Sequence, residues 1–212
     1  MSYSLLEMAA KGGWLMIVLL ALSVVAIYIF GKKIWMITKA GKIDRYFMND
    51  IQDQMHGGNI QAAQMLCQKY DSPIARMVEK GIEHRKKSAT EVQAAMENIG
   101  DVEVARLEKG LSGLATIAGG APMIGFLGTV TGMVKAFFNM ANSGNNVDIS
   151  LLSGGIYEAM ITTVGGLIVG IIAYFAYNFL IGRMNTLTAS MDSATADMLD
   201  ILESMPNNVE EK

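Results

Sequence analysis

Cysteine and histidine are scarce in this sequence, and their scarcity excludes several kinds of functional site. The one cysteine, Cys67, has no second cysteine with which to form an intramolecular disulfide, and we interpret it as an inert, buried helix residue. The two histidines, His56 and His84, have no cysteine or acidic partner at a ligand spacing, so no metal site is predicted. No soluble catalytic motif is present. We therefore expect a protein that is not an enzyme and that has no cofactor.

Charge is almost absent from three long stretches. Residues 12–31 and 110–134 are uncharged, and residues 149–182 contain Glu158 as their only charged residue. A helix needs about 20 apolar residues to cross a bilayer, so each stretch is long enough to do so. Most of the 22 glycines lie in these stretches, where small residues let helices approach closely. The sequence predicts an all-α membrane protein with three transmembrane helices and long cytoplasmic helical extensions.

The basic residues predict the orientation of these helices. Thirteen of the 17 lie within residues 32–109, between the first and second apolar stretches. By the positive-inside rule, this segment and the C-terminal tail are cytoplasmic, and the N-terminus is periplasmic. A secretory signal peptide fits the first stretch poorly, because Lys32 and Lys33 follow its apolar core instead of preceding it. This pair is most simply a topology anchor.

Helical spacing continues outside the apolar stretches. Ser88 and Glu91 form a capping box, and we expect the helix that starts there to run without a break into the second span. The third span is expected to continue to Pro206. These cytoplasmic helices either pack only against one another or also dock a further protein. The predicted segments are a periplasmic N-terminus (1–11), a first span (12–37), a cytoplasmic helical domain (38–109), a second span (110–140) continuous with the helix from about residue 88, a periplasmic loop (141–149), a third span (150–182), and a cytoplasmic C-terminal helix and tail (183–212).

Glu158 is the first candidate functional residue. An ionised carboxylate inside a membrane helix costs at least about 2.5–3.5 kcal/mol, so such a residue is rarely kept without a role. Glu158 lies about 11 Å outward from the midpoint of its stretch at about 1.5 Å per residue. The alternative interpretation takes Tyr157 as part of an outer aromatic belt and lets Glu158 reach the interface.

Threonines lie near this carboxylate in the sequence. Thr162 is four residues after Glu158 and shares its helix face, whereas Thr163 points away and could face a neighbouring helix. Thr129 and Thr131 lie in the glycine-rich part of the second stretch. A hydrogen bond to its own helix backbone is the simpler role for any single threonine, but the grouping favours a polar track.

Small residues predict how the spans pack. The pairs Gly128/Gly132 and Gly166/Gly170 are each spaced by four residues, so each pair clears one helix face. Pro122 removes a backbone hydrogen bond and is expected to kink or loosen the second span. Three helices cannot enclose a water path around one carboxylate, but a homo-oligomeric ring with Glu158 facing a central lumen could. We assign no function to Lys135, which is expected to snorkel at the outer end of the second span.

Two segments carry a resemblance to a known family. Residues 121–133 (APMIGFLGTVTGM) and 158–167 (EAMITTVGGL), with the later Tyr177 and Asn178, resemble the ExbB/TolQ/MotA family of ion-driven motor stator proteins. Three spans with one large cytoplasmic segment resemble the ExbB/TolQ branch, since the MotA branch has four spans.

The resemblance implies a homopentamer around a dimer of a single-span partner of the ExbD/TolR type, whose transmembrane aspartate works with the larger subunit. It also implies that Glu158, Thr163 and Thr129, and less directly Thr162, line the ion pathway. Two positions depart from the family pattern. Thr131 stands where a tryptophan is common, and Ile172 stands where a proline often occurs. The first could alter the lumen near Thr129, and the second suggests a straighter third helix.

The expected function is proton conduction in the inner membrane, which couples the proton motive force to a TonB- or TolA-type energy transducer. The alternative is a non-conducting membrane scaffold for an envelope or secretion complex. An intramembrane enzyme is a weaker alternative, because the three stretches hold no histidine, cysteine or second carboxylate. Contact with membrane lipid is expected, and contact with nucleic acid is not. The transported ion, proton or sodium, and the cargo system stay open.

Overall fold

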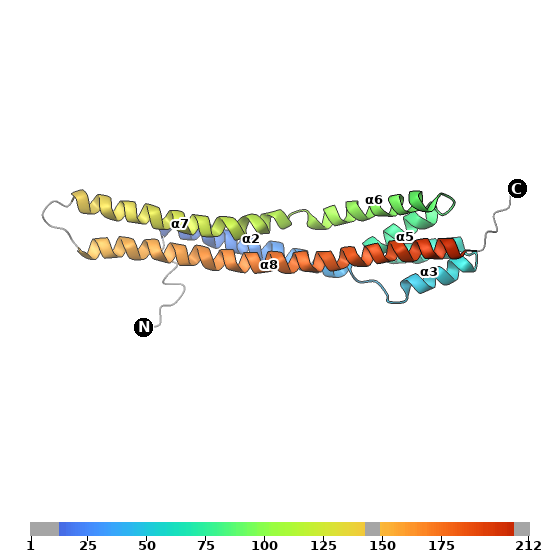
Figure 1. Ribbon diagram of the computed structural model, residues 1–212. Coiled ribbons are helices and arrows are strands. Elements are labelled where there is room, and N and C mark those ends of the chain that lie inside the picture. Colours follow the sequence, from blue (N-terminus) through green and yellow to red (C-terminus); the bar gives the residue numbers. More distant parts are fainter. Residues whose placement is uncertain (1–12, 143–148, 206–212) are drawn as a thin grey trace. The chain divides into compact units, whose positions relative to one another are not determined.

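The computed structural model describes residues 13–142 and 149–205, apart from the side chains of residues 149 and 151, and the described residues are helical with no strand (Figure 1). This confirms the predicted all-α class. The helices are α2 (Gly13–Ala40), α3 (Phe47–His56), α4 (Ile60–Lys69), α5 (Pro73–Glu83), α6 (Ala89–Glu108), α7 (Leu111–Asn142) and α8 (Ile149–Ser204).

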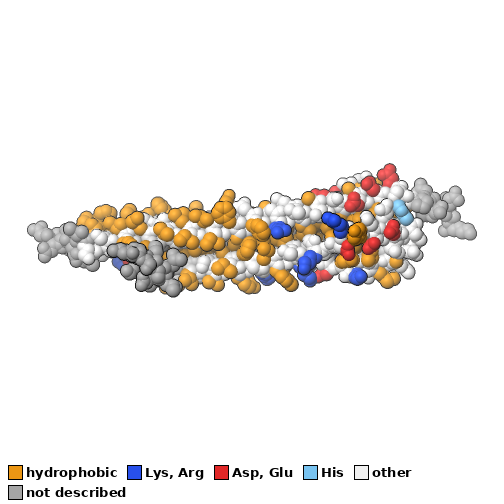
Figure 2. Space-filling view, turned by 90° about the horizontal axis from the view of Figure 1, so that it is seen from below, with side chains coloured by type: hydrophobic (Ala, Val, Ile, Leu, Met, Phe, Trp, Pro, Cys, Tyr) orange, Lys and Arg blue, Asp and Glu red, His pale blue; other side chains and the backbone are white. Residues whose placement is uncertain are grey.

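Three of these helices are long and apolar enough to cross a membrane: Gly13–Ala40, Leu111–Asn142 and Leu152–Ser204. They expose many large apolar side chains, including Ile17, Val24, Phe126 and Phe175. On the face drawn in Figure 2, hydrophobic side chains cover one part of the described chain, while most of the charged side chains gather over the other part. Exposed apolar surface of this extent is typical of a lipid-facing surface, so the protein is a multi-pass membrane protein.

The chain forms two compact units. The first comprises the described parts of Met1–Lys32 and Gly110–Phe179, which are the start of α2, all of α7 and the first part of α8. The second comprises Lys33–Lys109 and the described part of Leu180–Lys212, which are the end of α2, α3 to α6 and the remainder of α8.

The second unit has a core of aliphatic and methionine side chains. Val78 and Ile82 of α5, Met96 of α6 and Met198 of α8 are all almost completely buried. The helices approach one another closely here, because a Cβ atom on Gly81 would lie 2.7 Å from the sulfur of Met96 and 3.1 Å from Cγ of Met198. Burial of these side chains stabilises the second unit through the hydrophobic effect.

Local capping hydrogen bonds start two helices of this unit, α5 and α6. The hydroxyl of Ser72 accepts a hydrogen bond from the backbone N–H of Ala75, with Pro73 at the first helical position. Ser88 and Glu91 form the predicted capping box. Asn59 precedes α4, but its side chain makes no capping hydrogen bond.

The predicted continuous helix from about residue 88 into the second span is wrong. Helix α6 ends at Glu108 and α7 begins at Leu111. Between them Gly110 has a φ of +97°, a left-handed conformation that glycine adopts at little cost and that commonly ends a helix. Helix α7 continues through Pro122, the position at which the sequence predicts a kink or a loosening of the second span. The third span does continue beyond Arg183, as predicted, to Ser204.

Other predicted boundaries differ by a few residues, because α2 extends to Ala40 and α7 to Asn142. The predicted segment 1–11 lies outside the described residues, as do most of the loop 141–149 and the end of the tail 183–212.

Lys33, which the sequence suggested to be only a topology anchor, also has a structural role. Its side chain is buried, and its Nζ donates a hydrogen bond of 2.8 Å to the carbonyl oxygen of Leu107 in the last turn of α6. Because α6 ends at Glu108, this carbonyl is one of the four that a helix C-terminus leaves without an intrahelical partner. A lysine at this end also interacts favourably with the helix dipole.

We expect Lys33→Met to destabilise the protein by about 1.5–3 kcal/mol, since methionine keeps much of the aliphatic stem but removes a charged hydrogen bond. The measurement is thermal denaturation of the purified protein in detergent. Lys32→Met is the matched control, because Lys32 is exposed. Equal destabilisation by both variants would show that the Leu107 contact contributes nothing.

Ion pairs join three helices of the second unit, α2, α5 and α6, partly through Asp71, which lies between α4 and α5. Arg76 of α5 forms two hydrogen bonds of 2.9 Å with the carboxylate of Glu103 on α6, and a third of 2.9 Å with Asp71. Asp71 also accepts a 2.9 Å hydrogen bond from Lys39 near the end of α2. The Lys39 ammonium, and next the Arg76 guanidinium, lower the pKa of Asp71, so this carboxylate stays charged at neutral pH.

Candidate ion-pathway site

Helices α7 and α8 lie alongside each other in the first unit and pack through small residues (Figure 1). A Cβ atom on Gly128 would lie 2.5 Å from Cγ2 of Thr162, and one on Gly132 would lie 2.7 Å from Cβ of Ala159. Since real Cβ atoms do not approach other atoms this closely, the structure places both α7 glycines where only glycine fits.

The glycines of α8 lie in the same contact. A Cβ atom on Gly166 would lie 2.6 Å from the carbonyl oxygen of Ala121 and 2.8 Å from Cα of Gly125, and one on Gly170 would lie 2.5 Å from Cγ of Pro122. Pro122 is therefore a packing surface for Gly170. Gly125 belongs to neither of the two glycine pairs spaced by four residues. It lies in the glycine-rich segment 121–133 of the second span, and that position was the only sequence signal for its role in packing.

Two of the predicted pathway threonines meet between these helices. The hydroxyl groups of Thr129 on α7 and Thr163 on α8 hydrogen-bond to each other. Thr163 also donates to the carbonyl of Gly125 at 3.0 Å. Both side chains are half-buried. The pair is a polar contact inside an otherwise apolar helix interface, and Thr163 faces the neighbouring helix as predicted.

Thr162 precedes Thr163 on α8 and also lies against α7. It is buried, and its hydroxyl donates a hydrogen bond of 3.0 Å to the backbone carbonyl of Glu158. Its methyl group contacts Gly128. Thr162 thus shares the face of Glu158, as the four-residue spacing predicts, and makes the backbone hydrogen bond that was the simpler interpretation for a single threonine.

Glu158 is half-buried and lines a cleft of about 150 Å³ between the three apolar helices. The start of α2 reaches this carboxylate, because a Cβ atom on Gly13 would lie 2.5 Å from Oε1 of Glu158. Gly13 also has a φ of +64°, so both its conformation and its surroundings favour glycine. The cleft is lined by Gly13, Trp14, Leu15, Gly128, Thr131, Gly132, Lys135, Glu158, Ala159 and Thr162.

The four predicted pathway residues therefore form two groups, which are next to each other along α8. Glu158 and Thr162 line the cleft, and Thr129 and Thr163 form the pair between α7 and α8. Their role in ion transfer stays a prediction.

Two further residues of α7, Thr131 and Lys135, line the cleft with Glu158. The sequence suggested only that Thr131 could alter the lumen near Thr129, and no function was assigned to Lys135. Their spacing of four residues was the available signal, because it puts them on one helix face.

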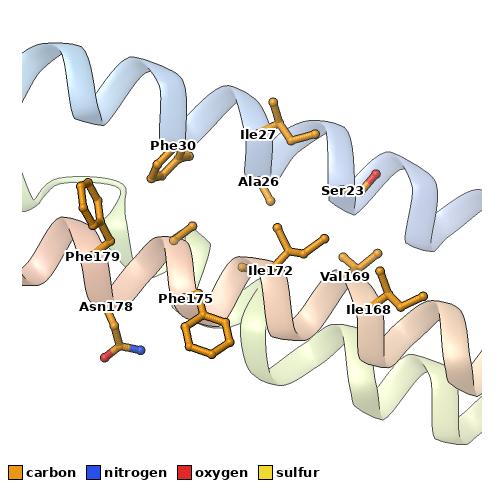
Figure 3. A pocket seen from close by; sticks show the side chains of 12 residues that line it. Ser23, Ala26, Ile27, Phe30, Ile168, Val169, Ile172, Phe175, Asn178 and Phe179 are labelled. Carbon is orange, nitrogen blue, oxygen red and sulfur yellow. The ribbon is translucent and has the colours of Figure 1, made fainter.

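A larger cavity of about 860 Å³ lies between α2 and α8, with Phe30 and Phe179 toward one end (Figure 3). The ring centroids of these two residues are 6.3 Å apart. Apart from Ser23 and Asn178 its lining is apolar, and it includes no ionisable side chain. Of these two cavities, only the Glu158 cleft is lined by ionisable side chains, Glu158 and Lys135.

Cys67 is not among the described residues that line the Glu158 cleft. Cys67 is buried as predicted, and burial raises the pKa of its thiol to about 12, which keeps it protonated and unreactive. Within residues 13–142 and 149–205, no group of three or more histidine, cysteine, aspartate or glutamate side chains could hold a metal ion.

These features define a multi-pass, all-α membrane protein with one carboxylate in a cleft between its three spans. Comparison with known sequences gives the family. The profile of the MotA/TolQ/ExbB proton channel family matches residues 69–193, more than half of the chain, and the chain belongs to this family. The resemblance of the two sequence motifs is thereby confirmed, and the family is one of transport proteins.

Three similar proteins carry ExbB names. An ExbB homolog of Methanothermobacter thermautotrophicus is 28% identical over 206 residues, which cover 96% of this chain and 70% of that protein. The ExbB-like 1 protein of Synechocystis sp. is 30% identical over 84% of this chain and 70% of its own length. The biopolymer transport protein ExbB of Neisseria gonorrhoeae is 31% identical over 60% of this chain and 64% of its own.

Proposed function

We propose that this chain is the proton-conducting subunit of an ion-driven motor in the inner membrane. It works with a single-span partner of the ExbD/TolR type and passes the energy of the proton motive force to a TonB- or TolA-type transducer. Membership of a proton channel family supports the conducting role, and the ExbB names of the relatives support the assignment to biopolymer transport.

The observation that carries the proposal is the position of Glu158. It is half-buried in a cleft bounded by α2, α7 and α8, each long and apolar enough to span a bilayer. A carboxyl group in such surroundings can hold and release a proton. The hydroxyls of Thr129 and Thr163 lie further along the α7–α8 contact. We propose that protons enter at Glu158 and are relayed past these hydroxyls to an aspartate of the partner.

The oligomer is part of the proposal. One set of three spans leaves much apolar surface exposed, including Met123 and Phe126 of α7 and Ile171 of α8. Five copies around a partner dimer would cover part of this surface and enclose a lumen. The N-terminus would be periplasmic and the C-terminus cytoplasmic, because most basic residues lie between the first two spans.

The driving force is sufficient for such a motor. A membrane potential of 100 mV contributes about 2.3 kcal/mol for each charge that crosses. That free energy exceeds RT about four-fold and can bias a rotation or tilt between subunits.

Reconstitution tests the proposal. The chain is placed in lipid vesicles with and without its single-span partner, and proton uptake is measured under an imposed potential, in sodium-free and in sodium-containing buffer. We expect proton uptake that requires the partner and does not require sodium. A complex that assembles with the partner but passes neither ion would instead support the non-conducting scaffold. The mass of the purified complex tests the pentamer.

A further inference from the structure

A lysine shares the cleft of Glu158. Lys135 on α7 is exposed and lines this cleft together with the half-buried Glu158 on α8. The packing of the two helices places them at the same level, because a Cβ on Gly132 would contact Ala159 and a Cβ on Gly155 would lie 3.0 Å from Cβ of Ala136. Lys135 thus lies beside the stretch of α8 that carries Glu158.

The two side chains are the only charged ones among the described residues that line the cleft, and they have opposite signs. Within the described chain, no hydrogen bond or ion pair shorter than 4 Å joins them. The flexible stem of a lysine lets its ammonium group move over several ångströms, and the ammonium has three donors. The ammonium group of Lys135 can therefore move into the cleft or out of it.

Thr131 provides a second acceptor on the same face of α7. Its hydroxyl donates a hydrogen bond of 2.8 Å to the carbonyl of Leu127, so its oxygen keeps lone pairs that can accept from an ammonium group. Thr131 and Lys135 line the cleft one helical turn apart. An ammonium group in the cleft would therefore have both a carboxylate and a hydroxyl as acceptors.

We propose that Lys135 is the counter-ion of Glu158, and that in a chain without its partner the ammonium group occupies the cleft and closes Glu158 to passing ions. An unpaired carboxylate among apolar helices is unfavourable, and a cation supplied by the same chain removes that cost until the partner arrives. This inference rests on the proposed function in taking Glu158 as the ion-path group. Lys135 acts through Glu158 and is a positioning residue.

The first test measures proton leak through the chain alone, reconstituted in vesicles under a potassium diffusion potential. We expect Lys135→Gln to raise the leak several-fold and Lys135→Arg, which keeps the charge, to leave it unchanged. Adding Glu158→Gln to Lys135→Gln should return the leak to that of the unmodified chain. Lys32→Gln, which removes an exposed lysine that does not line the cleft, is the matched control and should have no effect.

The second test needs no change at Lys135. In the Glu158→Gln variant, Lys135 should react several-fold faster with an amine acylating reagent than in the unmodified chain, as measured by mass spectrometry of its peptide. The labelling of Lys32 in the same samples should not change.

The proposal is overturned if the leak of Lys135→Gln equals that of the unmodified chain. It is also overturned if the raised leak persists in the double variant, or if the labelling of Lys135 is unaffected by Glu158→Gln. The labelling measures no ion flow. Faster labelling of Lys135 in a Glu158→Gln variant that still conducts with its partner would therefore refute the proposed function alone.

Discussion

Glu158→Gln is expected to reduce partner-dependent proton uptake to the level of vesicles without protein. Glutamine has nearly the shape of glutamic acid, so the packing against Gly13 and the hydrogen bond from Thr162 to the backbone of residue 158 should persist. What disappears is the only carboxylate among residues 149–182. The hydroxyl groups of the neighbouring threonines carry no charge and cannot replace it.

The measurement is proton uptake by vesicles that contain the chain and its partner, with assembly checked by the mass of the complex. Glu97→Gln is the control, because Glu97 is an exposed carboxylate of α6 in the other unit. Glu158→Asp retains an ionisable group and should keep part of the uptake. Undiminished uptake by an assembled Glu158→Gln complex would refute the relay.

Gly166→Ala is expected to destabilise the packing of α7 against α8. The added Cβ would meet the carbonyl oxygen of Ala121 at 2.6 Å and the Cα and nitrogen of Gly125 at 2.8 and 3.0 Å. These are backbone atoms, so no side-chain rotation can make room, and α7 and α8 must move apart. Overpacking of this kind costs about 1–3 kcal/mol.

The loss should extend beyond the packing itself, because the Thr129–Thr163 hydrogen bond crosses the same interface. The melting temperature of the protein in detergent is the measurement, and Gly166→Leu should yield no folded protein. Gly154→Ala is the matched control on the same helix, since a Cβ there meets no atom of the described chain within 4 Å. A Gly166→Ala variant as stable as Gly154→Ala would show that the close contact contributes nothing to stability.

The fold class was predictable because membrane helices satisfy their own backbone hydrogen bonds and are recognisable from composition. The uncharged stretches that begin near Gly12 and Gly110 correspond to α2 and α7. Capping is equally local, so the starts of α5 at Ser72 and of α6 at Ser88 could be predicted from a few neighbouring residues.

The break between α6 and α7 was not predictable for a physical reason. Glycine ends a helix at Gly110, yet Gly119 and Gly120 lie within α7. In a chain with 22 glycines the residue type alone does not tell which of them leaves the helical conformation. The buried contact of Lys33 with the end of α6 links residues far apart in the sequence, and it could be found only in the folded chain.

In the candidate site, too, local features were predictable from the sequence and tertiary contacts were not. By itself, the sequence determined that the third span carries a single carboxylate, Glu158, with Thr162 on its face, because both follow from composition and helical periodicity. Only the tertiary structure decided that Gly13 and Lys135 join this carboxylate in one cleft, while Thr129 and Thr163 meet at the neighbouring contact. The reason is that the register between α2, α7 and α8 is set by close packing of small residues, and no single helix contains that information.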